Sequence, residues 1–153
     1  MAHFYKPPII IITSDDLHVE QYDSIEHAER FLDPSTAQYN YFKGYDSEGR
    51  LLHVQSIFTK HEGLKVKISV AESKPNHTKE LKSLLRETLQ RSYDYAKTQG
   101  AINIHEWQHQ PWNDPTCDIK CLLDLYKTFM PKYPSLKETI IKFLHNKFRN
   151  ENK

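Results

Sequence analysis

The stretch from Tyr22 to Phe58 constrains the fold most, because it combines the pattern of a capped helix with that of a hairpin. Its first half reads Y-D-S-I-E-H-A-E-R-F-L-D-P, in which Asp23 lies three residues before Glu26. That is the spacing of a helix-capping box. Apolar residues at helical spacing follow it and predict a helix near 24–33, which Pro34 should end.

The second half of this stretch alternates in the manner of paired strands. Residues 39–46 predict one strand, and residues 50–58 predict its return. Ser47-Glu48-Gly49 lies between them and supplies a turn in which Gly49 can take a positive φ. The next run, residues 64–70, alternates cleanly with its apolar side chains facing inward. We therefore expect an antiparallel meander.

The rest of the chain supplies further strands and most of the helices. Ile9 to Thr13 is a β-branched run that predicts a buried strand, and residues 17–22 alternate weakly enough for a short second strand. Ala101 to Ile104 also reads more like strand than helix. Amphipathic patterns predict further helices near 77–98, 115–130 and 136–148. The predicted fold is α+β in a single domain, 1–153: an antiparallel sheet of four or five strands, one short N-terminal helix and three C-terminal helices.

Charge and cysteine content narrow the class of partner. The 153 residues carry 21 basic and 20 acidic side chains, a net charge of +1, so neither nucleic acid nor a membrane is expected as a partner. No stretch approaches the length of a transmembrane helix or a signal peptide. Cys117 and Cys121 form an i,i+4 pair, which is badly placed for a disulfide when both lie on one helix. We therefore expect reduced thiols and a cytoplasmic protein.

One motif has the form of a zinc hydrolase site. His105-Glu106-Trp107-Gln108-His109 matches H-E-x-x-H, in which two histidines on one helix face hold zinc and the glutamate acts as general base. Pro111 follows too soon for the helix to continue, and Gly100 precedes it closely. On a strand, His105 and His109 would lie about 13 Å apart, too far to share a metal.

A second metal hypothesis adds the two cysteines. The set His105, His109, Cys117 and Cys121 offers four ligands of the types that zinc prefers. The alternative is a pair of thiols buried on the inner face of a helix. We expect no cofactor and no metal, and a zinc-dependent hydrolase using His105, Glu106 and His109 remains the alternative function.

A resemblance gives the leading functional hypothesis. The run from Ile10 to Val54, with D-S-I-E-H-A-E-R-F-L-D-P and G-Y-D-S-E-G-R-L-L, resembles the N-terminal part of small bacterial proteins encoded near polymorphic or contact-dependent toxins. Those proteins are similar to immunity proteins, which bind and block a cognate toxin. The resemblance implies a non-enzymatic binding protein. Because the chain has no export signal, we expect the toxin to have a cytoplasmic target, such as a nuclease or a nucleotide-consuming enzyme.

Aromatic residues are the candidates for the partner-binding surface, because tyrosine and tryptophan are enriched at binding hot spots. The tyrosines of the predicted hairpin could equally form a sheet face that the helices cover. The two tryptophans flank a proline-containing segment that we expect near the surface. The candidate residues are Tyr39, Tyr41, Tyr45, Trp107 and Trp112.

Overall fold

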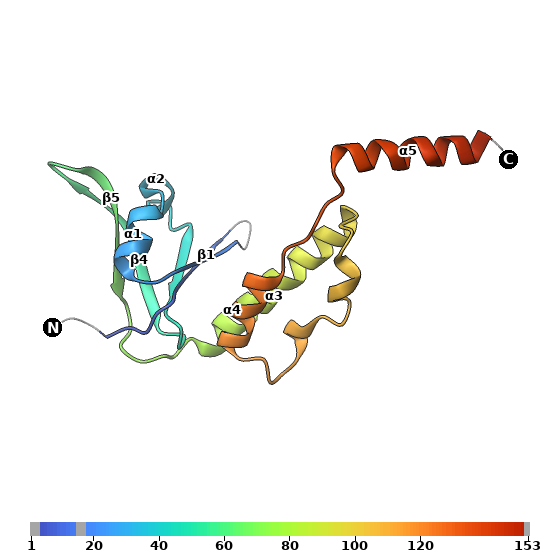
Figure 1. Cartoon of the computed structure of the whole chain (residues 1–153). Helices are drawn as coiled ribbons and strands as arrows, with labels where there is room; N and C mark the ends of the chain where they lie inside the picture. Colours follow the sequence, from blue (N-terminus) through green and yellow to red (C-terminus); the bar gives the residue numbers. More distant parts are fainter. Residues whose placement is uncertain (1–3, 15–17, 152–153) are drawn as a thin grey trace.

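The fold is α+β, as predicted: five antiparallel strands with helices on both faces of the sheet (Figure 1). The computed structural model describes residues 4–14 and 18–151, and for residue 138 the backbone alone. The strands are β1 (Ile9–Thr13), β2 (Val19–Tyr22), β3 (Phe42–Tyr45), β4 (Leu51–Thr59) and β5 (Gly63–Val70). The helices are α1 (Ile25–Phe31), α2 (Pro34–Ala37), α3 (Thr78–Thr98), α4 (Ile119–Thr128) and α5 (Leu136–Glu151), with short 3-10 turns η1 (Ile104–Trp107) and η2 (Pro111–Asn113).

The strand order β2-β1-β3-β4-β5 departs from a simple meander. Strands β3, β4 and β5 follow one another as expected, but β3 pairs with β1 on the side away from β2. The chain therefore crosses over β1 between β2 and β3, and α1 and α2 form this crossover. The hydrophobic pattern could not reveal this order, because it fixes which face of a strand is buried and not which strand lies beside it. Leu17, which we assigned to the second strand, lies outside the described residues.

Strand β1 is an interior strand of the sheet, and helices cover both of its faces. Ile9 and Ile11 pack in the core beneath α1 and α2, whereas Ile10 and Ile12 pack in the core beneath α3 and α4. All four side chains are buried. An uninterrupted β-branched run is what a strand needs when both of its faces are dry. The prediction of a buried strand from this run is confirmed.

Two helix boundaries differ from the prediction. Helix α1 is capped by Ser24, whose side chain accepts the backbone N–H of His27 at 3.1 Å, and not by Asp23. Pro34 does not simply end a helix but begins α2, with Asp33 as its N-cap. Proline is favoured at the first helical position because its missing N–H would have no partner there.

Three further segments were assigned wrongly. The strand predicted over residues 39–46 begins only at Phe42, because Asn40 takes a left-handed conformation with φ 55°. The helix predicted over 115–130 begins only at Ile119, where the Asp118 side chain accepts the N–H of Cys121 at 2.9 Å. Residues 101–104 form no strand either, since Ile104 begins the turn η1.

A buried carboxylate organises the turn between β3 and β4. Asp46 is completely buried and forms an ion pair with the guanidinium of Arg50. Its Oδ1 accepts the backbone N–H groups of Glu48 and Arg50 at 3.0 and 2.9 Å, and its Oδ2 accepts that of Lys6 at 3.0 Å. Arg50 Nε donates to the carbonyl of Ser73 at 2.8 Å. The turn is thereby joined to the N-terminal segment and to the chain that enters α3.

The edges of the sheet are β2 and β5. In β5, the backbone N–H of Ile68 donates to Glu29 Oε2 of α1 at 3.1 Å, so a side chain takes the place of a neighbouring strand there. In β2, Gln21 Nε2 lies 3.5 Å from the carbonyl of Leu123 in α4. Among the described residues, no helix is long and apolar enough to cross a membrane.

Gly49 permits the close approach of α3 to this turn. Its φ is +92°, as the turn pattern predicts, and a Cβ built on it would lie 2.6 Å from both Cα and N of Thr78. Backbone atoms at that distance cannot move aside cheaply. The same contact lets the N–H of His77 donate to the carbonyl of Gly49 at 3.0 Å. Any side chain at residue 49 therefore pushes the start of α3 away from the sheet.

We predict that Gly49→Ala lowers the free energy of unfolding by about 1–3 kcal/mol more than Gly63→Ala does. Gly63 is the matched control, because its φ is +73° and a Cβ there meets nothing within 4 Å. The control therefore isolates the cost of the backbone conformation alone. Urea unfolding of both variants measures the difference, and equal losses would contradict the close packing of Thr78 on this turn.

Candidate functional site

The H-E-x-x-H segment does not have the geometry of a metalloprotease. His105 lies in the four-residue turn η1, and His109 lies beyond its end. Both side chains are exposed, as is Glu106. Gln110, directly after His109, has a φ of +47°, and Pro111 then begins the second short turn, η2. The two histidines therefore do not share a helix face, which the zinc-hydrolase mechanism requires.

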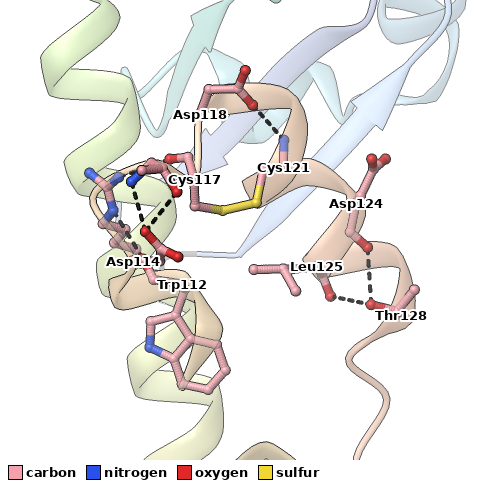
Figure 2. Close-up of a disulfide and its surroundings, with 10 residues drawn as sticks. Trp112, Asp114, Cys117, Asp118, Cys121, Asp124, Leu125 and Thr128 are labelled. Carbon is pink, nitrogen blue, oxygen red and sulfur yellow. Dashed lines mark hydrogen bonds between the residues drawn. A yellow bond between two sulfur atoms is a disulfide. The ribbon is translucent and has the colours of Figure 1, made fainter. Parts of the chain in front are cut away.

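The second zinc hypothesis is wrong because Cys117 and Cys121 form a disulfide (Figure 2). Sulfur atoms in a disulfide are not thiolates and cannot serve as zinc ligands. Among the described residues, no group of three or more His, Cys, Asp or Glu side chains is placed to hold a metal ion. The placement of His105, Glu106 and His109 therefore does not support a zinc-dependent hydrolase.

The expectation of reduced thiols is wrong for a local reason. It assumed that both cysteines lie on one helix, but Cys117 precedes the N-cap residue Asp118 and only Cys121 is helical. The turn before the helix brings their Cα atoms to 5.2 Å, within the range of disulfides. Arg86 Nη2 holds this turn by donating to the carbonyl of Cys117 at 2.9 Å. In Figure 2 the bridge links this turn to the first turn of α4, beside the capping bond from Cys121 N to Asp118.

Two of the five aromatic candidates are buried. Trp112 is completely covered, its Nε1 donates to Gln90 Oε1 at 2.9 Å, and its ring packs against Tyr93 and Phe129. Tyr45 is 1% exposed and belongs to the same core. The expectation that Trp112 lies near the surface is wrong, because η2 turns its ring inward toward α3. Neither side chain can contact a partner in this conformation.

The other three aromatic candidates reach the surface to different extents. Trp107 is half-buried and packs edge-on against Phe129 with ring centroids 5.1 Å apart. Tyr41 is also half-buried, and its carbonyl accepts the N–H and hydroxyl of Ser14 at 2.9 Å each. Tyr39, in the loop after α2, is 76% exposed. The structure therefore brings Tyr45, Trp107 and Trp112 to one core and leaves Tyr39 free for contact.

A more prominent apolar surface lies on β4 and β5, which extend as a two-stranded arm at one end of the molecule (Figure 1). We define the arm as residues 56–66. Phe58, at 78%, is the most exposed large apolar side chain among those described, and it pairs across the strands with exposed Leu64. Side chains two residues apart share a face, so Phe58 points to the same face as buried Leu52 and Val54. The core face of the sheet thus continues past α1 and α2 without a cover.

Charged side chains lie at the end of the arm and on its opposite face. Lys65 Nζ lies 2.8 Å from Glu62 Oε2 near the end of the arm. The hydrogen bond from Lys65 holds the pKa of Glu62 below its usual value. A cleft between the arm and α1 is lined by these two residues together with Glu26, Glu29 and Arg30. An apolar centre with a charged rim is the usual composition of a protein-binding surface.

One cluster of acid–base side chains lies at the start of α3. His77 is 3.1 Å from Glu72 Oε2 through Nε2 and 2.9 Å from Glu80 Oε2 through Nδ1. The hydrogen bonds with Glu72 and Glu80 raise the pKa of the imidazole above its usual value. Burial, with a further contribution from Glu80, raises the pKa of Tyr45. The groups are paired with one another, so the cluster fastens α3 to the sheet rather than presenting a free acid or base.

The sequence analysis missed the arm because it assumed that the inward-facing side of an alternating strand is covered along its whole length. Leu64 continues the inward-facing series of its strand, and the prediction therefore buried it, whereas Phe58 was assigned to a strand with no statement of its burial. Exposure depends on the lengths of α1 and α2, which end before they cover this part of β4. The one available signal was the length of the two alternating runs, which exceeds that of the short strands beside them.

The comparisons with known proteins leave the family of this chain open: no protein-family model, no curated protein and no solved structure matches it.

We predict that protein purified without added metal carries no stoichiometric zinc. The geometry of His105 and His109 lacks the shared helix face that would hold the ion. Elemental analysis of the wild type and of a His105→Ala, His109→Ala double variant is the measurement. One zinc per chain in the wild type, lost in the variant, would contradict this interpretation.

Reduction of the disulfide should lower the free energy of unfolding by about 2 kcal/mol, the value expected from chain entropy for so short a loop. Chemical denaturation with and without dithiothreitol measures the loss. A Cys117→Ser, Cys121→Ser double variant is the control, because its stability should not respond to the reductant. An equal response in both proteins would show that the reductant acts elsewhere.

Proposed function

We propose that this chain is a non-enzymatic binding protein, specifically an immunity protein that neutralises a cognate bacterial toxin by steric occlusion. The observation that carries the proposal is the uncovered apolar face of the arm, formed by Phe58 and Leu64. Large apolar side chains that adjoin one another on a surface are typical of protein interaction sites. Its position at the end of a projecting hairpin lets it enter a concave surface on a partner.

The arm has the composition of an interface hot spot. Phe58 supplies a large apolar side chain with few rotatable bonds, so little conformational entropy is lost when a partner covers it. The exposed ion pair between Lys65 and Glu62 lies near the end of the same hairpin and adds a charged group to the arm. Tyr39 extends the candidate surface from the loop after α2. We propose these residues as the toxin contacts, in place of Tyr45 and Trp112.

The proposal of an immunity protein rests on the resemblance of residues 10–54 to the N-terminal part of such proteins. That segment runs from β1 through α1, α2 and β3 into β4. It therefore includes Tyr39 and ends just before the arm. The resemblance transfers no catalytic residue, which agrees with a function in binding. The remaining helices, α3 to α5, lie outside it.

We propose the cytoplasm as the site of action and a toxin with a cytoplasmic target. Disulfides persist mainly in oxidising environments, so the redox state of Cys117 and Cys121 in cells is the observation that tests this compartment. Alkylation of free thiols in intact cells distinguishes the two cases. Two alkylated cysteines per chain support the cytoplasm, and protection against a periplasmic toxin alone would exclude it.

The toxin to test is the product of the adjacent open reading frame. We predict that Phe58→Ala and Tyr39→Ala each weaken toxin binding by more than about 1 kcal/mol, or roughly fivefold in dissociation constant. Isothermal titration calorimetry measures the affinity, and growth of cells that express both proteins measures protection. Both side chains are exposed, so the fold should be unaffected.

Phe148→Ala is the matched control, because Phe148 is a similarly exposed ring on α5 and not on the arm. It should leave toxin affinity unchanged. Undiminished affinity in both test variants would remove the arm and Tyr39 as the contact surface. A toxin that the wild type neither binds nor blocks would remove the proposed function itself.

A further inference from the structure

Helix α5 projects away from the rest of the molecule (Figure 1). Every side chain described in it is exposed to solvent. Six of these side chains are large and apolar: Leu136, Ile140, Ile141, Phe143, Leu144 and Phe148. A helix that faced water on all sides would gain nothing from such residues, and most helices in proteins owe their stability to a packed apolar face. An apolar face of this size implies a surface that covers it.

The apolar residues of α5 form one continuous stripe. Placed at 100° per residue, the six side chains fall within an arc of about 160°, which is typical of a helix that packs against a globular surface. The opposite side carries Lys142, Arg149 and His145. The sequence shows the stripe clearly, and it predicts an amphipathic helix near residues 136–148.

Hydrogen bonds fix the start of the segment between α4 and α5. Three hydrogen bonds pin the segment to residues 102–103. Ile102 N donates to the carbonyl of Lys132 at 2.8 Å, Lys132 N donates to Asn103 Oδ1 at 2.7 Å, and Asn103 Nδ2 donates to the carbonyl of Met130 at 3.1 Å. Pro131 and Pro134 stiffen it further. The path of the chain is therefore fixed up to Lys132, and residues 133–135 connect this point to α5.

A complementary surface is exposed at the base of the helix. A groove lies between α3, α4 and the segment that follows α4, and its walls include Tyr95, Tyr126, Phe129 and Tyr133. We call it the tyrosine groove. Exposed Ile102 and Met130 belong to the segments that flank it. Counted together, α5, the groove and its flanks hold ten of the fifteen exposed large apolar side chains among the described residues.

We propose that α5 of one chain docks its apolar stripe into the tyrosine groove of a second copy, so that two chains exchange these helices in a symmetric dimer. The stripe and the groove are both exposed on one chain. In a dimer with a two-fold axis, the stripe of each chain covers the groove of the other, so no stripe and no groove is left exposed. Exchange of a terminal element across a proline-containing connection is a low-cost route to such a dimer.

The size of the contact is sufficient for a stable dimer. A fully covered aromatic side chain buries about 150–250 Å². Ten large apolar side chains at roughly half exposure therefore supply on the order of 800 Å² per chain, which is the area of a standard interface. A helix of 16 residues is about 24 Å long, long enough to span the groove and its flanks. The proposal does not depend on toxin binding, because it uses the opposite end of the molecule from the arm.

The test is the mass of the full-length protein in solution over a concentration series, measured by sedimentation velocity or light scattering. We expect a dimer whose fraction rises with concentration. An Ile140→Asp, Phe143→Asp double variant should raise the dimer dissociation constant by about tenfold or more. A Phe58→Asp, Leu64→Asp double variant is the matched control, because it places the same two charges at exposed apolar residues of the arm, and it should change the constant by less than about twofold.

A mixing experiment separates helix-in-groove docking from pairing of one α5 with another. A Tyr95→Asp, Tyr133→Asp double variant loses the groove but keeps the helix, so it should be monomeric alone. Mixed with the α5 variant, it should form a mixed dimer, because one intact helix meets one intact groove. Native mass spectrometry identifies that species.

Several outcomes would overturn the proposal. Both variants differ from the wild type only at exposed side chains, so near-ultraviolet circular dichroism of the buried Trp112 should confirm that each is folded. A wild-type protein that remains monomeric at every concentration contradicts the exchange, whether or not it binds anionic vesicles through α5. A dimer that survives loss of the groove, or a mixture that forms no mixed dimer, contradicts the docking site.

Discussion

The buried ion pair between Asp46 and Arg50 is the interaction on which the rest of the structure depends. It joins three parts of the chain that are distant in sequence: the segment before β1, the turn between β3 and β4, and the residues before α3. A carboxylate without solvent is tolerated only when its hydrogen bonds are nearly all satisfied, and removal of one partner from such a pair costs about 3–5 kcal/mol. Arg50 also lies 5.6 Å from the ring of Phe4, which covers the pair from outside. The hydrogen bonds of this ion pair therefore hold the sheet and the start of α3 together beside Gly49, and apolar packing stabilises the remaining contacts between them.

Local chemistry made part of this fold predictable from sequence. Residues with strong periodicity, such as Val66 and Ile68 in β5 or Leu81 and Leu85 in α3, were assigned correctly because one face of each element is dry. Tyr45 and Trp112 were misjudged because their burial depends on contacts far along the chain, with α3 in both cases. The disulfide was missed because the start of α4 was placed four residues too early, and that error changed Cys117 from a turn residue into a helical one. The spacing of His105 and His109 says nothing about the backbone that carries them, and the neighbouring Gly100 and Pro111 were the residues that indicated no long helix there.

The arm and α5 lie at opposite ends of the molecule (Figure 1), and this separation has a consequence for binding. A dimer joined through α5 would present two arms on one assembly. Two linked binding surfaces raise the apparent affinity for a partner that is itself multimeric or tethered, without any new contact. Dimerisation and toxin recognition could then be altered independently by substitution, because the residues that serve each surface do not overlap.

The hydrogen bond from Ile68 to Glu29 has a further consequence for solubility. A strand at the edge of a sheet exposes backbone donors that can recruit another strand, and this is a common origin of aggregation. In β5 one such donor is already occupied by a carboxylate from α1, which would have to be displaced before a second chain could pair there. Lys65 and Lys67 place charged side chains along the same strand, and charged residues on an edge strand disfavour its pairing with another strand. The chain can thus expose a long hairpin for recognition while its edge strand resists growth into a larger sheet.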